Sequence, residues 1–454
     1  MGIARLGPRY LPFADVASPE MPLSKWLRLS LFQVSVGMAL VLLVGTLNRV
    51  MIVELTVPAS VVGIMISLPL VFAPFRALIG FRSDTYRSAI GWRRAPFIFR
   101  GSMLQFGGFA VMPFALLVLA GWGHAADAPQ WIGITGAAIA FLLVGAGAHM
   151  VQTVGLALAT DLAKPEDQPK VVGLMYVMLL VGMALSALIF GALLSDFSPG
   201  RLIRVVQGAA VLTLVINIIA MWKMEPRGHR PPSDGGADPQ FMVAWRAFLQ
   251  QTQPTRRLFV IGLGTMGFAM ADVLLEPYGG QVLQLSVAET TRLTAAFAVG
   301  GLIGLVGASR MLSRGGEPLL LAGGGILVGI PAFMLVMLAS LGQSLLLFGV
   351  GTMLMGLGAG LFGHGTLTAT MRLAPREQVG LALGAWGAVQ ATAAGVAISL
   401  GSILRDVIQH LPMAKLAGTG TPYLAVYCLE IVLLLFALLV LAPLLPQRAA
   451  TAAR

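Results

Sequence analysis

Long apolar segments recur along the whole chain, separated by short stretches rich in charge, proline or glycine. Each is close to the roughly 20 residues that a helix needs to cross a bilayer. Strands of about ten residues with alternating polarity, typical of an outer-membrane barrel, are not apparent. The pattern predicts an all-α polytopic membrane protein with twelve transmembrane helices, over residues 29–53, 59–79, 96–120, 131–158, 171–194, 202–222, 258–284, 293–312, 319–341, 345–371, 378–404 and 423–445.

One stretch, EPRGHRPPSDGGADPQ from residue 225, combines proline, glycine and charge as a linker does. It divides the chain into a segment 1–28, a six-helix bundle 29–224, a linker 225–256, a second six-helix bundle 257–445 and a tail 446–454. Within the linker, MVAWRAFLQQ suits either an amphipathic helix at the membrane surface or an ordinary linker helix.

The two halves resemble each other. DLAKPEDQPKVVGL after the fourth predicted span matches MRLAPREQVGLAL after the tenth, and GAGAH matches GAGLFGH. NRVMIVEL at the end of the first span matches ADVLLEPY in the seventh, which aligns Glu54 with Glu276. Two parallel repeats of six spans predict the major facilitator fold.

Composition supports a membrane protein, since 57% of the residues are hydrophobic and 11% are charged, against about 25% charged in soluble domains. The net charge of +11 is interpreted as basic cytoplasmic loops and not as nucleic-acid binding. Arg82, Arg87, Arg93 and Arg94 follow the second span, whereas GWGHAADAPQ and SLGQS contain no Lys or Arg. Both termini and the linker are therefore expected in the cytoplasm.

The loop GFRSDTYRSAIGWRRAP resembles the signature that follows the second helix of major facilitator proteins. Gly80 would allow close helix approach, Asp84 would pair with a neighbouring span, and Gly91, Arg93 and Arg94 would hold the cytoplasmic end. The spacing between Asp84 and the basic pair is longer than in that family. The alternative is a basic loop that only sets topology.

Two histidines, His149 and His364, lie inside predicted spans. A neutral imidazole there suits an axial ligand of a magnesium or iron macrocycle, or a polar group bonded across helices. Gln152 has the same two interpretations. The single cysteine, Cys428, forms no intrachain disulfide, and no cysteine–histidine spacing predicts a metal site.

Charged residues within or at the ends of spans are expensive in lipid and normally pair or line a pathway. Glu54, Asp272 and Glu276 are predicted to form a cluster, with Arg49 or Arg76 as counter-ion. Asp272 and Glu276 are four residues apart and share a helical face. The alternative places these acids at the outer interface, where they are solvated.

Several long blocks carry a family resemblance: SLFQVSVGMALVLLVGTLNRVMIVEL, APFRALIGFRSD, GWRRAPF, HMVQTVGLALATDLA, DVLLEPYGGQVL and ALGAWGAVQATAAG. Together they resemble the PucC/LhaA family of phototrophic bacteria, on the PucC side. The resemblance implies a major-facilitator-like protein of the intracytoplasmic inner membrane that helps assemble the light-harvesting antenna. It implies bacteriochlorophyll as cargo, and as partners the antenna α/β polypeptides, the reaction-centre core or pigment-synthesis enzymes.

The first functional hypothesis is a non-enzymatic assembly factor in which His149, His364 or a glutamate binds the pigment magnesium; carotenoid or lipid is an alternative cargo. The rival is a proton-coupled carrier of a small molecule that uses Asp272 and Glu276. A pigment-synthesis enzyme is disfavoured, since the chain has no nucleotide loop and no aspartate-rich pair for a prenyl diphosphate.

Overall fold

The computed structural model describes residues 18–71, 79, 83, 86, 88, 91–122, 125, 127–164, 167–226, 252–373, 379–412 and 418–445. These residues form helices and connecting turns, with no strand among them. The predictions for Arg76, Gly80, Asp84, Arg82 and Arg87 lie outside the described residues, as does the linker segment MVAWRAFLQQ.

The first half contains six spans. The first is built from α2 (Leu23–Leu29), α3 (Leu31–Leu40) and two π-helical pieces, η2 (Val41–Leu47) and η3 (Val50–Glu54). The following spans are α4 (Ala59–Val71), α6 (Ala95–Leu119), α7 (Gln130–Leu162), α8 (Gln168–Leu193) and α9 (Pro199–Met221).

The second half repeats this order. Its first span is interrupted at Met270 and consists of α11 (Thr252–Ala269) and α12 (Ala271–Gln281). It continues with α13 (Val287–Ser313), α14 (Pro318–Gly342), α15 (Leu345–Leu373), α16 (Val379–His410) and α18 (Thr421–Leu441), which ends in the short 3-10 turn η6 (Ala442–Leu444).

Eleven segments of the described residues are long and apolar enough to cross a membrane, and α4 is the shorter apolar helix at the second position. The predicted all-α fold of two six-helix halves is confirmed. The division of the chain into an N-terminal segment, two bundles, a linker and a tail, with the limits given above, stays a prediction. Some spans extend beyond their predicted bounds, because capping residues decide where a helix begins: Ser286 and Glu289 form a capping box that starts α13 at Val287.

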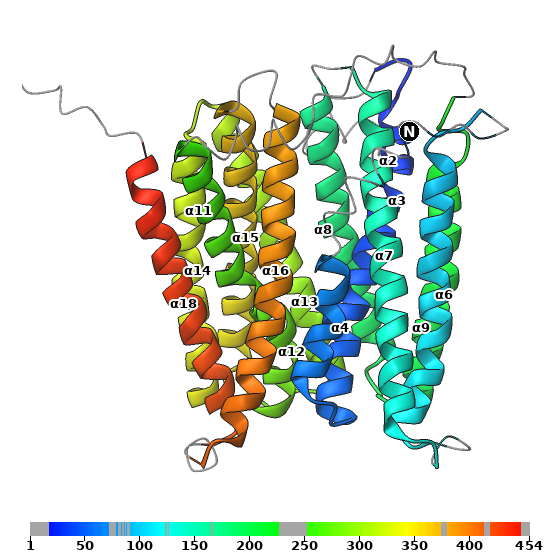
Figure 1. Cartoon of the computed structure of the whole chain (residues 1–454), viewed down its shortest axis with the longest axis vertical. Coiled ribbons are helices and arrows are strands. Elements are labelled where there is room, and N and C mark those ends of the chain that lie inside the picture. Colours follow the sequence, from blue (N-terminus) through cyan, green and yellow to red (C-terminus); the bar gives the residue numbers. More distant parts are fainter. Residues whose placement is uncertain are drawn as a thin grey trace, which may run out of the picture.

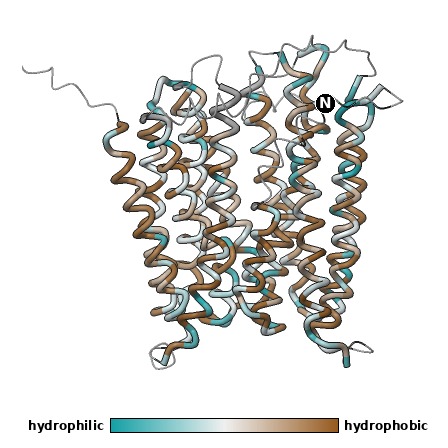
Figure 2. Tube along the Cα trace, in the orientation of Figure 1, coloured by the Kyte–Doolittle hydropathy of each residue, from teal (hydrophilic) through white to brown (hydrophobic). Residues whose placement is uncertain are grey.

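The two halves lie side by side, and α2 begins at the same end of the bundle as α18 ends (Figure 1). We call this end the terminal face and the other end the opposite face. Apolar residues dominate the helices along their length, and polar residues gather toward the ends (Figure 2). Many large apolar side chains are exposed on the outside, among them Phe114, Trp131, Leu346 and Leu439, as expected for a surface in contact with lipid.

The halves pack against each other through α8 with α13 and through α4 with α16. Ser67 and Ser399 share a hydrogen bond of 2.7 Å across the second pair. Toward the opposite face the Asp406 carboxylate of α16 accepts the Ser60 backbone N–H of α4 at 2.7 Å. Because a helix N-terminus leaves its first N–H groups without partners, this bond both caps α4 and joins the halves.

Candidate functional site

The end of the first span meets α12 at a polar site near the opposite face. Pro277 of α12 has no backbone N–H, so the Val273 carbonyl four residues earlier has no partner in its own helix. Asn48 of the first span donates its side-chain amide to that carbonyl at 2.6 Å. The Asn48 amide, from the other half of the protein, therefore supplies the donor that Pro277 cannot provide to the Val273 carbonyl.

Two glycines allow the spans to approach at this site. A Cβ on Gly45 would lie 2.5 Å from Glu276 Oε1 of α12, and a Cβ on Gly280 would lie 2.9 Å from the Arg49 guanidinium. Each span thus offers a glycine to receive the charged side chain of the other. The fit is reciprocal, and any larger side chain at either glycine would displace a buried charged group.

Arg49 pairs with Glu54 of its own span. The residues are five apart, and the π-helical turn of η3, with its wider i→i+5 spacing, brings such positions to one side. Arg49 also donates to the Leu285 carbonyl at 2.8 Å, and its charge acts on Glu276. The Arg49 side chain is 4% exposed and that of Glu54 is 37% exposed, so Glu54 lies at the edge of the site.

Glu276 lies inside the site, at 3% exposure. Thr294 of α13 donates to its Oε1. The Oε2 atom is buried without a hydrogen-bond partner. Thr291 of α13 lies 3.3 Å from Thr46 of the first span, hydroxyl to hydroxyl. The first span therefore contacts both α12 and α13 through polar groups.

Asp272 occupies a different environment from Glu276. It is exposed, whereas Ala271 and the residues from Val273 to Gly280 are buried. The helix break just before it is capped from α18, where buried Glu430 accepts the Ala271 N–H at 2.7 Å. The structure thus places Asp272 beside Glu430 and Glu276 beside Arg49.

A second polar cluster, formed by Arg405, Asp406, Gln281 and Tyr423, lies near the opposite face. Arg405 of α16 donates to Gln281 Oε1 at 2.6 Å and to Asp406 at 2.8 Å. Its guanidinium lies 4.9 Å from the ring centre of Tyr423, a distance that favours a cation–π contact. Tyr423 also donates its hydroxyl to Gln281 at 2.7 Å.

Sequence reasoning did not select Gly45, Asn48, Gly280, Thr294 or Gln281 for this site. A signal was present for Asn48, since a proline inside a span leaves a carbonyl that needs a donor from elsewhere. The sequence marks Gly280, together with Pro277 and Gly279, only as a point where the span weakens, and nothing in the local pattern marks Gly45 among the 55 glycines of the chain.

The predicted pigment ligands lie on other helices. His149 and Gln152 are on α7 and His364 is on α15, and all three are partly buried. His149 and Gln152 each have an interaction partner. Among the described residues no group of three or more His, Cys, Asp or Glu side chains could hold a metal ion.

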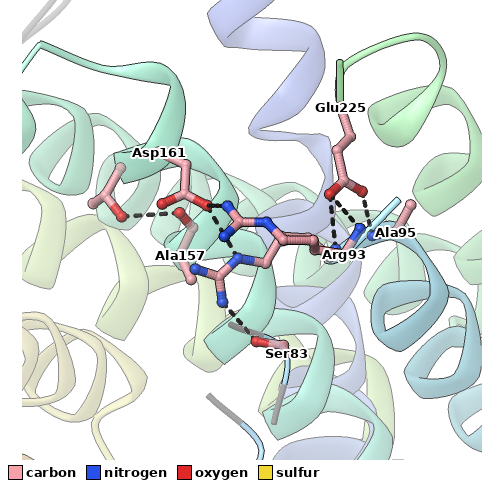
Figure 3. A network of polar contacts seen from close by, with 8 residues as sticks. Ser83, Arg93, Ala95, Ala157, Asp161 and Glu225 are labelled. Atoms are coloured by element: carbon pink, nitrogen blue, oxygen red, sulfur yellow. Dashed lines mark hydrogen bonds and ion pairs between the residues drawn. The ribbon is translucent and has the colours of Figure 1, made fainter. Parts of the chain in front are cut away.

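The basic loop motif is engaged at the terminal face (Figure 3). Arg93 and Arg94 each pair with Asp161 of α7 at 3.1 Å, and Arg94 donates to Ser83 at 2.6 Å. The Glu225 carboxylate accepts the backbone N–H groups of Arg93, Arg94 and Ala95 at 2.7–2.9 Å. Gly91, with φ of 82°, adopts the left-handed turn before them. The motif ties the start of α6 to α7 and to the end of α9.

Comparisons with known proteins give a consistent result. The family model described as "PUCC protein" matches residues 46–449. The chain is 63% identical to "Protein PucC" of Rhodovulum sulfidophilum, over 93% of each chain. It is 60% identical to "Protein PucC" of Cereibacter sphaeroides, over 100% of this chain and 98% of that one. A more distant relative, 28% identical over 86% of this chain and 90% of that one, is the "Bacteriochlorophyll synthase 44.5 kDa chain" of Rhodobacter capsulatus.

Solved structures of similar shape are membrane transporters. A bacterial homologue of the iron transporter ferroportin, in an inward-facing state, covers 92% of this chain and 97% of its own, with a TM-score of 0.64 and 17% identity. At this identity the likeness concerns the fold alone, which is that of the major facilitator group.

Proposed function

The chain belongs to the PucC family, and from this premise we propose that it is an assembly factor for the bacterial light-harvesting antenna. In this role it binds or delivers bacteriochlorophyll and chaperones antenna α/β polypeptides in the photosynthetic membrane. The observation that carries the proposal is the 60% identity with a PucC protein along the entire chain. The name of the more distant relative from Rhodobacter capsulatus, a bacteriochlorophyll synthase chain, supports the pigment link.

The outer surface suits a chaperone of single-span polypeptides. Large apolar side chains are exposed on many helices, including Leu188 and Ile189 of α8 and Leu435 and Leu439 of α18. Helices in lipid associate by van der Waals packing and interhelical hydrogen bonds. Antenna polypeptides would therefore dock on this surface from the lipid phase, and the reaction-centre core or pigment-synthesis enzymes are further candidate partners.

Bacteriochlorophyll needs one axial nitrogen or oxygen donor for its magnesium. His149 and His364 offer partly buried imidazoles on α7 and α15, and Gln152 or the carboxylates of Glu54, Asp272 and Glu276 offer oxygen. Of these acids, Glu54 and Asp272 are exposed and Glu276 is buried. A carotenoid or a lipid is an alternative cargo that requires no axial donor.

The proposal is tested by purifying the full-length protein in mild detergent from phototrophic cells. We expect a preparation that shows bacteriochlorophyll absorption and contains antenna α/β polypeptides, identified by mass spectrometry. An unrelated twelve-span transporter purified in the same way from the same cells is the control. A colourless preparation without antenna polypeptides would contradict the proposal.

The second candidate function is proton-coupled transport of a small molecule. It is favoured by Asp272, an exposed carboxylate next to the break between α11 and α12, since interrupted spans form substrate and ion sites in many transporters. Uptake into proteoliposomes with and without a pH gradient separates the two functions. Transport that depends on the gradient and stops in Asp272→Asn would support the carrier.

We place the protein in the intracytoplasmic inner membrane, with both termini in the cytoplasm. Arg93 and Arg94 at the terminal face support this orientation. Reporter fusions at the C-terminus and in the loop between α9 and α11 test this orientation. A reporter that is active only in the periplasm should be inactive at both positions, and its activity there would show that the orientation is the opposite one.

A further inference from the structure

A cavity of about 370 Å³ lies between the start of α6 and the end of α9, at the terminal face. Its size falls within the roughly 300–1,000 Å³ of ligand pockets. It extends from Trp92 at the rim to Ser102, and the eight residues from Ala95 to Ser102 span about 12 Å of helix. The cavity therefore reaches from the membrane surface into the hydrocarbon layer.

The inside of the cavity is apolar, with walls formed by Ile98, Phe99 and Ile218. The polar side chains at its deep end are already satisfied. Ser102 donates to the Ile98 carbonyl at 2.8 Å, and Asn217 donates to Ser102 at 2.9 Å. Nothing inside calls for a polar ligand group, so the occupant that fits is a hydrocarbon chain.

The cavity opens sideways to the lipid. Phe99 is 55% exposed and Ile218 is 43% exposed on the outer surface of the bundle. Trp222, at the rim, is 61% exposed, and tryptophan at this level is typical of the membrane–water interface. A chain would enter from the bilayer, with its head group remaining at the rim.

The rim carries unpaired positive charge. Lys223, which lines it, makes no ion pair within the part of the chain that the structure describes. Arg28 lies beside the rim, where its guanidinium donates to the Trp222 carbonyl and to the Met224 sulfur, each at 3.0 Å, and its charge has no acidic partner among the described residues. The acidic group at the rim, Glu225, is occupied by the three N–H groups that it caps. Figure 3 shows the bonds that join Glu225 to the start of α6.

We propose that this cavity binds one acyl chain of an anionic phospholipid, with the phosphate at Lys223 and Arg28. The apolar interior selects the chain and the basic rim selects the negative head group. This site goes beyond the proposed function, because it requires neither pigment nor an antenna polypeptide. Its bound lipid would fill the gap between α6 and α9 and hold the terminal face of the first half in place.

Native mass spectrometry of the full-length protein, released from nanodiscs that contain equal phosphatidylglycerol and phosphatidylcholine, tests the proposal. We expect one retained phosphatidylglycerol, with a preference on the order of tenfold from the two basic residues. Ile218→Phe, whose larger ring narrows the cavity between α6 and α9, should reduce retention of phosphatidylglycerol several-fold. Ile219→Phe is the matched control, because Ile219 is exposed on the same helix but does not line the cavity.

Lys223→Gln should reduce the preference for the anionic lipid, because only Arg28 then remains at the rim, whereas Arg310→Gln, on the terminal face of the other half, should preserve it. Equal retention of the two lipids by the unmodified protein would overturn the proposal, as would retention of phosphatidylglycerol by Ile218→Phe at the level of Ile219→Phe. A pigment or neutral lipid in place of phosphatidylglycerol would also overturn it. Thermal unfolding of both isoleucine variants checks that they are folded.

If Ile218→Phe does not fold, quenching of tryptophan fluorescence by brominated phosphatidylglycerol replaces it. Trp222→Phe should then lose a saturable quenching component that Trp131→Phe, at an exposed position on α7, retains. Identical quenching of the two variants would count against the site.

Discussion

The Glu276 carboxylate of α12 occupies the space that a side chain on Gly45 of the first span would need, with its Oε1 2.5 Å from the position of a Cβ. In return, Gly280 of α12 makes room for Arg49 of the first span. The two segments are more than 200 residues apart in the sequence, and in each of them a glycine makes room for an ionisable side chain of the other. This contact, together with the Asn48 bond to Val273, holds the halves together near the opposite face.

Gly45→Ala should destabilise the protein by about 1–3 kcal/mol, the usual cost of overpacking a core. The added methyl group displaces the Glu276 carboxylate, so the cost should fall by at least half in a Glu276→Ala background. Thermal unfolding in mild detergent measures both. Gly307→Ala is the control, since a Cβ there has no neighbour within 4 Å. Equal costs in the two backgrounds would show that Gly45 does not act through Glu276.

Asn48→Leu should cost about 1–3 kcal/mol, because it leaves the Val273 carbonyl buried without a donor. Pro277→Ala supplies the missing N–H from within α12, so the double variant should recover part of the loss. The four proteins form a double-mutant cycle that is read by thermal unfolding. Additive effects would mean that Asn48 does not compensate for Pro277.

Glu225→Ala should destabilise the start of α6 by roughly 0.5–2 kcal/mol, the range for loss of a helix cap. Glu225 accepts three backbone N–H groups there. Hydrogen exchange measured by mass spectrometry should show faster exchange at residues 93–97. Glu317→Ala is the control, since Glu317 precedes α14 without a side-chain capping bond. If hydrogen exchange at residues 93–97 is unchanged, the Glu225 cap contributes little to the stability of the start of α6.

Replacing His149 and His364 together with Phe should strip pigment from the purified protein, if either imidazole binds the magnesium. The absorption spectrum relative to protein concentration measures the loss. His410→Phe, at the opposite-face end of α16, should keep its pigment. Full pigment content in the double variant would exclude the histidines as ligands.

Glu276→Gln should reduce antenna assembly in phototrophic cells. The amide keeps the size of the side chain and an acceptor for Thr294, but it replaces the carboxyl group that lies near Arg49. Asp127→Asn, at an exposed position in the turn before α7, should assemble normal antenna levels. The near-infrared absorption of isolated membranes gives the readout. If antenna assembly is lost in Asp272→Asn but not in Glu276→Gln, the functional residue is Asp272, at the break between α11 and α12.

Much of the fold was predictable from the sequence, because the hydrophobicity and length of each segment by themselves determine whether it spans the membrane. A segment such as 318–342 is apolar throughout and long enough to span a bilayer, so its own composition makes it a transmembrane helix. The match between NRVMIVEL and ADVLLEPY likewise revealed the duplication without knowledge of any contact. Boundaries were less predictable where a cap decides them, as Ser286 and Glu289 do for α13.

The tertiary structure alone decided which polar residues meet. The sequence placed Arg49, Glu54, Asp272 and Glu276 near the ends of matching spans, but their pairing depends on the rotation and depth of each helix. Those are set by side-chain packing between distant segments: Gly45 and Gly280 fix the approach of the spans, and the π-helical turn directs Arg49 to Glu54. Hydrophobicity acts on each segment separately, whereas this register exists only after the two halves have packed together.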